Sequence, residues 1–450
     1  MTTRPNPNPN EPLEADLLLL NGRVLTLDAR DRCYERGMVA VRGPRIVAVG
    51  GLEPGSRPIR AKKTLDVGGC VVMPGLINSH THAAMTIFRG LADDLPLMDW
   101  LHNHIFPAER RLTEEWVYWG TLLACAEMML SGTTTFCDMY LFEHKVAEAA
   151  KAAGMRAVVG EVLYDFPSPH YGPIEEGLRF TQSLIEQWAG DPLVRIAIEP
   201  HAPYTCGPPL LEACRDMGNR YRVPIIMHVS ENESEVEQIR GRYGLRPVAH
   251  LDRMGLLGPD FVALHCVALD DQDMDLLAQN KVHVVHNPES NMKLASGIAP
   301  VPRLLDRGVN VALGTDGCAS NNDLDLFAEM DTCAKLHKVS RMDPTVLPAR
   351  SVLGMAVGSG ARALGFGADL GEISTGKLAD IIVLDFNRPH LTPLYDTTSH
   401  LVYAARGADV RHSIIHGRLV MEDRQVLTLD VDEVMDHVRN LARAVRTTPG

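Results

Sequence analysis

The sequence predicts an α/β protein in which a (β/α)8 barrel of the TIM type is accompanied by a small β-sandwich. Short apolar strands alternate with helical stretches eight times between residues 71 and 366, which is the pattern of such a barrel. The segments before and after this region are β-rich, so the two ends of the chain can pair into one sandwich. Histidines and carboxylates gather where the strands end, and barrel enzymes carry their chemistry at the carboxyl ends of their strands.

The chain begins with a Pro/Asn repeat, MTTRPNPNPNEP, which cannot bury a core, so we predict a disordered tail over residues 1–12. Residues 13–70 alternate short apolar runs with turn formers. The dipeptides Asn21-Gly22 and Gly43-Pro44 predict hairpin turns between these runs. The first part of the sandwich is therefore assigned to residues 13–70.

The second part of the sandwich is assigned to residues 367–427, where short strands are again broken by Gly and Asp. Residues 428–450 are predicted to form a carboxyl-terminal helix and tail. Within the barrel region, helical stretches lie between most of the strands, and one of them closes on Gly154 as its C-cap. The eight predicted strands are PGLINSHTH, TTTFCDMY, RAVVGEVLY, VRIAIEPHA, PIIMHVSE, FVALHCVAL, VHVVHNPES and NVALGTDG.

Composition narrows the class of function. The chain has 450 residues, of which 22% are charged and 45% hydrophobic, as in an ordinary soluble globular protein. A net charge of -13 without a basic block argues against nucleic acid and membranes as partners. The nine cysteines include no CxxC pair, which favours reduced thiols in the cytoplasm. No apolar run approaches the length of a membrane span.

The run from Val71 ends in His80-Thr81-His82. Side chains two residues apart in a strand point to the same side, so His80 and His82 are placed side by side, as two ligands of one metal ion would be. The alternative is a pair of surface histidines beyond a buried strand.

Other strand ends carry polar residues that make the metal interpretation stronger. Each one has a structural explanation of its own: His286, in a run of turn formers, is expected to bond the backbone at the barrel rim, and Glu199 to brace a turn. Together, however, desolvated histidines and carboxylates on one rim need a partner, and a divalent cation supplies it. The residues are Glu199, His201, His228, Glu231, His265, His286 and Asp316.

Five of these segments, PGLINSHTH, HVSE, ALHC, HNPESNMKL and GTDGCASNN, resemble the amidohydrolase superfamily in its cytosine-deaminase-like branch. Within that branch, MTIFRGLADDLPLMDWLHNHIFPAE is similar to the 5'-methylthioadenosine/S-adenosylhomocysteine deaminases. The resemblance covers nearly the whole chain after the tail. It implies a metal-dependent hydrolase that converts 5'-methylthioadenosine to 5'-methylthioinosine and ammonia, with S-adenosylhomocysteine and adenosine as further substrates.

The resemblance also implies roles for individual residues. The metal ligands would be His80, His82, His228 and Asp316. Glu231 would shuttle protons, Asp316 would accept one, and His265 would hold the nucleophilic water. In the substrate pocket, Trp100 would border the nucleoside, with Glu109 and His201 at the ribose.

One divalent metal ion per chain is expected, because the fourth strand, VRIAIEPHAPYT, lacks the lysine that two-metal members of the superfamily use. Zn2+ is preferred, and the donor set also suits Fe2+, Mn2+ or Ni2+. By analogy the protein would be a homodimer or homotetramer. Two alternatives stay open: an amidohydrolase of the same branch that acts on guanine, a pterin or a triazine, and a non-catalytic scaffold with this fold.

Overall fold

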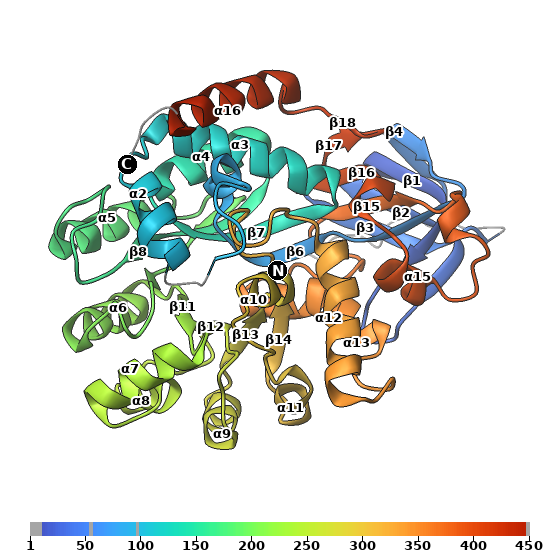
Figure 1. Cartoon of the computed structure of the whole chain (residues 1–450). Helices are drawn as coiled ribbons and strands as arrows, with labels where there is room; N and C mark the ends of the chain where they lie inside the picture. Colours follow the sequence, from blue (N-terminus) through green and yellow to red (C-terminus); the bar gives the residue numbers. More distant parts are fainter. Residues whose placement is uncertain (1–10, 54–56, 96–98, 447–450) are drawn as a thin grey trace, which may run out of the picture.

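The computed structural model describes residues 11–53, 57–95 and 99–446. It confirms the α/β class: parallel strands occupy the centre of the molecule and helices surround them (Figure 1). Strands from the beginning and the end of the chain, blue and red in Figure 1, lie side by side at one flank of this central part. The predicted tail, residues 1–12, falls almost entirely outside the described residues.

The two ends of the chain share one nine-stranded sheet, which runs β18-β17-β16-β15-β5-β1-β2-β3 with β4 paired to β1. The join is antiparallel: Ile381 to Asp385 pair with Pro74 to Cys70. The strands are β1 (Leu13–Leu25), β2 (Cys33–Arg42), β3 (Arg45–Gly51), β4 (Ile59–Asp66), β5 (Cys70–Pro74), β15 (Ile381–Asp385), β16 (Val410–Ile415), β17 (Arg418–Glu422) and β18 (Gln425–Val426).

One of the two predicted hairpins is correct. Gly43-Pro44 joins β2 to β3, with Arg42 paired to Arg45 across the turn. The hairpin at Asn21-Gly22 is wrong, because β1 continues through it to Leu25. Its register against β2 shifts on both sides of Gly22, so the dipeptide makes a bulge. Val72 and Val67 crowd the position of a Cβ on Gly22 at 2.8 and 2.9 Å, which explains a glycine there.

The central strands are parallel and follow the chain order. One sheet holds β6 (Leu76–Thr81), β7 (Thr133–Tyr140), β8 (Arg156–Leu163), β9 (Val194–Ile196) and β10 (Glu199–Pro200). The other holds β11 (Ile225–Val229), β12 (Phe261–His265), β13 (His283–His286) and β14 (Asn310–Leu313). A parallel bridge between Ile198 and Ile225 links the two sheets. The other edges of the two sheets, β14 and β6, also meet: the Asp316 amide, just after β14, donates to the His80 carbonyl on β6 at 3.0 Å.

Some helices end or begin at capping groups that the sequence offers. Helix α4 (Glu143–Ala153) ends at Gly154, whose φ of 76° is the left-handed conformation that glycine adopts readily, as predicted. Helix α9 (Asp271–Gln279) begins with a capping box between Asp270 and Asp273. The remaining helices are η1 (Ala83–Phe88), η2 (Trp100–Ile105), α2 (Phe106–Glu109), α3 (Glu114–Leu130), α5 (Ile174–Gln187), α6 (Pro208–Tyr221), α7 (Glu233–Tyr243), α8 (Pro247–Arg253), α10 (Pro288–Lys293), α11 (Val301–Asp306), α12 (Leu326–Arg341), α13 (Ala349–Gly354), η3 (Met355–Ser359), α14 (Gly360–Ala363), η4 (Pro389–Leu391), α15 (Thr397–Tyr403), η5 (Gly407–Asp409) and α16 (Val431–Arg446).

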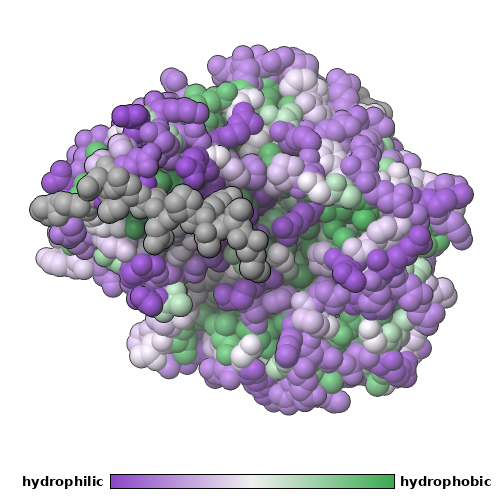
Figure 2. Space-filling view, turned by 180° about the vertical axis from the view of Figure 1, so that it is seen from behind, coloured by the Kyte–Doolittle hydropathy of each residue, from purple (hydrophilic) through white to green (hydrophobic). Residues whose placement is uncertain are grey.

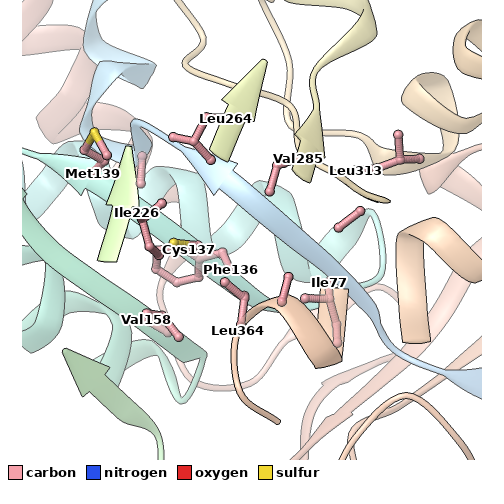
Figure 3. Packing of buried hydrophobic residues seen from close by; sticks show 14 of the residues in the cluster. Ile77, Phe136, Cys137, Met139, Val158, Ile226, Leu264, Val285, Leu313 and Leu364 are labelled. Atoms are coloured by element: carbon pink, nitrogen blue, oxygen red, sulfur yellow. The ribbon is translucent and has the colours of Figure 1, made fainter. Parts of the chain in front are cut away.

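The largest hydrophobic cluster fills the space inside and around the parallel strands. Figure 3 shows side chains from successive strands, such as Ile77, Phe136, Val158, Ile226 and Leu264, packed toward one another. A second cluster belongs to the nine-stranded sheet and joins residues of both chain ends, including Leu19, Val41, Ile381 and Val383. A third, small cluster of Ala15, Leu18 and Ala40 lies among β1 and β2, so the described residues form three separately packed hydrophobic clusters.

Hydrophilic residues cover most of the face shown in Figure 2, with smaller hydrophobic areas between them. Along the described segments of the chain, none of the helices combines the length and the apolar composition that crossing a bilayer requires. All nine cysteines are free thiols, and only Cys33 is exposed.

Candidate active site

The carboxyl ends of β6, β11 and β14 bring His80, His82, His228 and Asp316 together. One Asp316 carboxylate oxygen, Oδ1, lies 3.1 Å from His82 Nε2 and 3.4 Å from His80 Nε2. The ring centroid of His80 is 4.8 Å from that of His82 and 5.0 Å from that of His228. Both ring nitrogens of His80 lack a hydrogen-bond partner among the described residues although the side chain is fully buried. A buried donor set of this kind fits a metal ion.

Backbone carbonyls orient two of the imidazoles. His228 Nδ1 donates to the His201 carbonyl at 2.8 Å, and His82 Nδ1 donates to the Met139 carbonyl. Because a carbonyl oxygen only accepts, the proton of each neutral ring is on Nδ1. In the neutral form of each ring the Nε2 lone pair is therefore left for a cation, and at His82 that cation would displace the proton that Asp316 stabilises.

Burial and mutual repulsion keep most of these histidines neutral. Burial lowers the pKa of His80 to about 4, and it lowers the pKa of His228 well below the ordinary value with help from the neighbouring histidines. Burial also disfavours the charged form of His82, but the hydrogen bond and charge of Asp316 outweigh it and raise the pKa of His82 to about 9. Although burial opposes it, the nearby imidazoles of His80 and His82 hold the pKa of Asp316 well below its usual range.

Asp316 is fixed by donors that surround both of its oxygens. Oδ1 accepts from the Gly317 amide at 2.8 Å, while Oδ2 accepts from Ser290 Oγ at 2.6 Å and Ser320 Oγ at 3.0 Å. The two serine hydroxyls are themselves 3.1 Å apart. Asp316 therefore presents a pre-oriented oxygen toward the histidines.

Glu231 and His265 flank the cluster. His265 ends β12 and is held by the amides of Asn291 and Asn287, whose atoms lie 2.8 and 3.3 Å from His265 Nδ1. Burial raises the pKa of Glu231, and the negative charge of Asp316 adds to the effect against the opposing influence of His265. A carboxyl group with a raised pKa beside a metal-type site suits proton transfer near neutral pH.

A pocket opens directly beside this cluster. The four predicted substrate contacts, Trp100, Glu109, His201 and Glu231, all line it together with His265 and Asp316. Burial raises the pKa of Glu109 to about 7, and it lowers the pKa of His201 to about 3 with help from His82. The rest of the wall is largely apolar or aromatic and includes Met85, Ile105, Phe106, Leu141, Val162, Tyr164 and Leu294.

Two sequence-based expectations outside the cluster differ from the structure. His286 does not bond the backbone at the rim: it is fully buried, and its Nε2 lies 3.2 Å from Nε2 of His337 on α12. Two neutral imidazoles can share one proton in this way, and burial lowers the pKa of both. Glu199 points into the interior, where Cys137 Sγ contacts its Oε1 at 3.9 Å, and it braces no turn.

The residues that support the cluster were not predicted from the sequence. Ser290 and Ser320 hold Asp316, and Tyr140 lines the pocket with its ring centroid 5.9 Å from that of His82. Tyr140 is the last residue of β7, so the strand-end argument could have found it. The serines follow strands β13 and β14 by several residues, and only the tertiary structure brings their hydroxyls to one carboxylate oxygen.

Comparison with known proteins gives consistent matches. The model of the amidohydrolase family matches residues 71–420. A 5-methylthioadenosine/S-adenosylhomocysteine deaminase of Syntrophobacter fumaroxidans is 71% identical over 432 residues, which is 96% of this chain and 99% of that protein. A 5'-deoxyadenosine deaminase of Methanosarcina acetivorans is 46% identical over 95% of this chain and 98% of its own length. The crystal structure of an adenosine deaminase from Xanthomonas campestris with bound zinc superposes with a TM-score of 0.95 at 39% identity, covering 97% of this chain and all of the other.

Proposed function

This chain belongs to the amidohydrolase family, and from that premise we propose that it converts 5'-methylthioadenosine to 5'-methylthioinosine and ammonia. It is a hydrolase that acts on the C–N bond of a cyclic amidine, in the manner of the adenine nucleoside deaminases that match its full length. The observation that carries the proposal is the position of Glu231 in a pocket next to the buried His80, His82, His228 and Asp316 cluster.

His80, His82, His228 and Asp316 would hold one divalent metal ion, with Zn2+ as the preferred species. Three imidazoles and one carboxylate suit Zn2+ in a catalytic site that keeps a position open. The zinc in the Xanthomonas campestris structure and the unpartnered nitrogens of His80 support this assignment. When bound, such an ion lowers the pKa of a water molecule to roughly 7 and so supplies a nucleophile at neutral pH.

The residues around the ion would move the protons. Glu231 takes one proton from the attacking water and gives it to the ring nitrogen beside the carbon under attack. Asp316 receives the second proton and returns it to the departing amine, which leaves as ammonia. His265, fixed by Asn291, holds the water by a hydrogen bond. Protons and charge balance over the cycle, and both carboxylates are regenerated.

Trp100, Glu109 and His201 would bind the nucleoside. Glu109 and His201 offer hydrogen-bonding groups to the two ribose hydroxyls, while Trp100 covers the apolar side of the pocket. About 100 Å3 of space is free in the pocket, less than the roughly 300 Å3 of a typical small-molecule site. We therefore expect the Trp100 segment to be displaced as the nucleoside enters.

The wall of the pocket favours an apolar 5' substituent. Among its described lining residues there is no arginine or lysine. Arg156 pairs with Asp380 in the interior, and Arg179 pairs with Glu176 at the surface, so neither is poised to meet a substrate carboxylate. A methylthio group finds apolar surface here, whereas the amino-acid carboxylate of S-adenosylhomocysteine finds no cationic partner.

We also propose a domain architecture, a cellular location and an oligomeric state for this chain. The parallel strands β6 to β14 would form the (β/α)8 barrel of residues 71–366, and the nine-stranded sheet the β-sandwich of residues 13–70 and 367–427. The shared core of both chain ends supports the sandwich. Nine free thiols suit the reducing cytoplasm. A homodimer or homotetramer is proposed by analogy alone.

The test is ammonia release from 5'-methylthioadenosine, adenosine, S-adenosylhomocysteine, guanine and a pterin in one buffer, compared as kcat/KM. We expect the order to be 5'-methylthioadenosine, then adenosine, then S-adenosylhomocysteine, with guanine and the pterin inactive. A tenfold preference for S-adenosylhomocysteine, about 1.4 kcal/mol in the transition state, would contradict the assignment of the 5' pocket. Faster turnover of guanine or the pterin would contradict the substrate class, and no turnover of any compound would favour a non-catalytic scaffold.

A further inference from the structure

A second cavity lies at the opposite end of the parallel strands from the candidate active site. Its volume is about 570 Å3, within the range of small-molecule sites. Val194 and Ile196 on β9, Pro224 before β11 and Asp260 before β12 line it, so it opens at the amino ends of these strands. The candidate active site uses the carboxyl ends of the strands, and the two sites share no lining residue.

Three arginines, Arg195, Arg222 and Arg362, line the cavity. None of the three forms an ion pair with a carboxylate in the part of the chain that the structure describes. Arg195 Nη1 donates to the Gly365 carbonyl at 3.0 Å, and its guanidinium lies 3.8 Å from the centroid of the Phe366 ring. Arg362 donates from Nε to Asn310 Oδ1 at 2.9 Å and from Nη2 to Ser359 Oγ at 3.0 Å. Neutral partners therefore hold both guanidiniums in place without a direct ion pair among the described residues, and the charge of Asp369 acts on Arg195 only from a distance.

The two carboxylates that line the cavity are already neutralised by cations outside its wall. Asp191 pairs with Lys151 and also accepts from the Leu193 amide at 2.9 Å. Asp260 accepts from Arg215 Nη1 at 3.2 Å. In a chain with a net charge of -13, the cavity is thus a local region of positive charge. Burial lowers the pKa of Arg195, with a further contribution from Arg156, and burial lowers the pKa of Arg362.

Arg222 is the C-cap of α6 and has a φ of 56°, in the left-handed region where a side chain costs roughly 1 kcal/mol and glycine is favoured. Its side chain is exposed and has no hydrogen-bond or ion-pair partner among the described residues. The guanidinium of Arg222 at the cavity wall is therefore available to an anion.

We propose that this cavity is a second binding site, which takes a phosphate-bearing small molecule by contact of its phosphate oxygens with Arg195, Arg222 and Arg362. The guanidinium group offers a planar pair of donors that matches two phosphate oxygens, and three such groups match a polyphosphate better than a single carboxylate. Trp188, Val223 and Leu364 give the cavity apolar surface for the rest of the ligand.

The test is calorimetric titration of the metal-loaded protein at low ionic strength with uridine 5'-diphosphate, and with uridine as the uncharged counterpart. We expect saturable binding of one uridine 5'-diphosphate per chain, weaker binding as salt is added, and no binding of uridine. The readout does not use deamination, so its failure would leave the proposed function untouched. Absence of saturable binding, or equal binding of uridine, would overturn the proposal.

Arg222→Gly is an informative variant, because it removes the guanidinium and also removes the steric cost of a side chain in the left-handed conformation. We expect binding about tenfold weaker, since a hydrogen-bonded charge is lost, with a thermal midpoint no lower than that of the wild type. Lys281→Gly is the matched control: Lys281 also has a positive φ, 57°, is exposed and does not line the cavity. Its affinity should stay within about twofold of the wild type. An unchanged affinity in Arg222→Gly, or an equal loss in both variants, would refute the site.

Discussion

The hydroxyl of Ser290 is expected to control how tightly the metal is held. Ser290 Oγ donates to Asp316 Oδ2 at 2.6 Å, a bond to a charged acceptor in a buried site. Such bonds contribute about 1.5–3 kcal/mol. In Ser290→Ala the same oxygen still accepts from Ser320 at 3.0 Å, so we expect the lower end of that range, about 1.5 kcal/mol or roughly tenfold in metal affinity.

Metal affinity would be measured by competition with a chelator of known strength, and kcat/KM would be measured on the fully loaded protein. Ser413→Ala is a matched control, because its buried hydroxyl donates to the Met129 carbonyl at 2.9 Å, remote from the cluster. It should lower stability and leave metal affinity unchanged. Because Ser290 and Ser320 donate to the same Asp316 oxygen, the Ser290→Ala/Ser320→Ala double variant leaves Oδ2 with neither donor and should lose more affinity than the two single losses combined. If Ser290→Ala binds metal as tightly as the wild type, Asp316 is not a ligand that these hydroxyls orient.

Four further predictions follow from the same site. Glu231→Gln should retain the metal and lose about 10²–10⁴-fold in kcat, because the amide keeps the shape of the side chain but transfers no proton; a loss of less than about threefold would remove Glu231 from the mechanism. Since burial raises the pKa of Glu231, the acid limb of the kcat/KM profile should have its midpoint above the ordinary carboxyl value of 4.5, and activity should fall as pH drops through it. A carboxyl with a raised pKa favours folding when protonated and opposes it when ionised, so metal-free Glu231→Gln should melt at a higher temperature than the wild type at pH 7 and lose this advantage in acid. Finally, a chelator-stripped protein should regain full activity with one equivalent of Zn2+ per chain, measured by elemental analysis beside the rate, and a requirement for two would contradict a single-metal site.

Much of the site was predictable because functional side chains in parallel sheets lie at the carboxyl ends of the strands. His80, His82, His228, His265 and Asp316 all follow short apolar runs, and parallel strands place their carboxyl ends at one edge. The period of two along a strand also placed His80 and His82 on one side. Both rules depend on local sequence alone, so they place these residues near one another without knowledge of the contacts between elements.

Local sequence was misleading where the same residues are compatible with two different local structures. Asn21-Gly22 is a good hairpin turn, yet it serves equally as a bulge when the strand on each side pairs with the same neighbour. His286 lies among turn formers, which suggested the rim, but its partner His337 comes from α12, 51 residues later. No spacing rule connects two positions that meet only when a helix packs on a strand.

The α/β class, the order of the strands and the residues at their carboxyl ends could be inferred from the amino-acid sequence, because hydrophobic periodicity and strand-end chemistry are local properties. The groups that support that cluster, and the arginines without a direct ion pair, became known from the folded structure. Ser290 and Ser320 meet on one carboxylate oxygen, and Arg195, Arg222 and Arg362 converge on one cavity, although they come from separate elements. The physical reason is that hydrogen bonding and charge compensation depend on distances across the fold, and these distances are set by how the elements pack rather than by their positions in the chain.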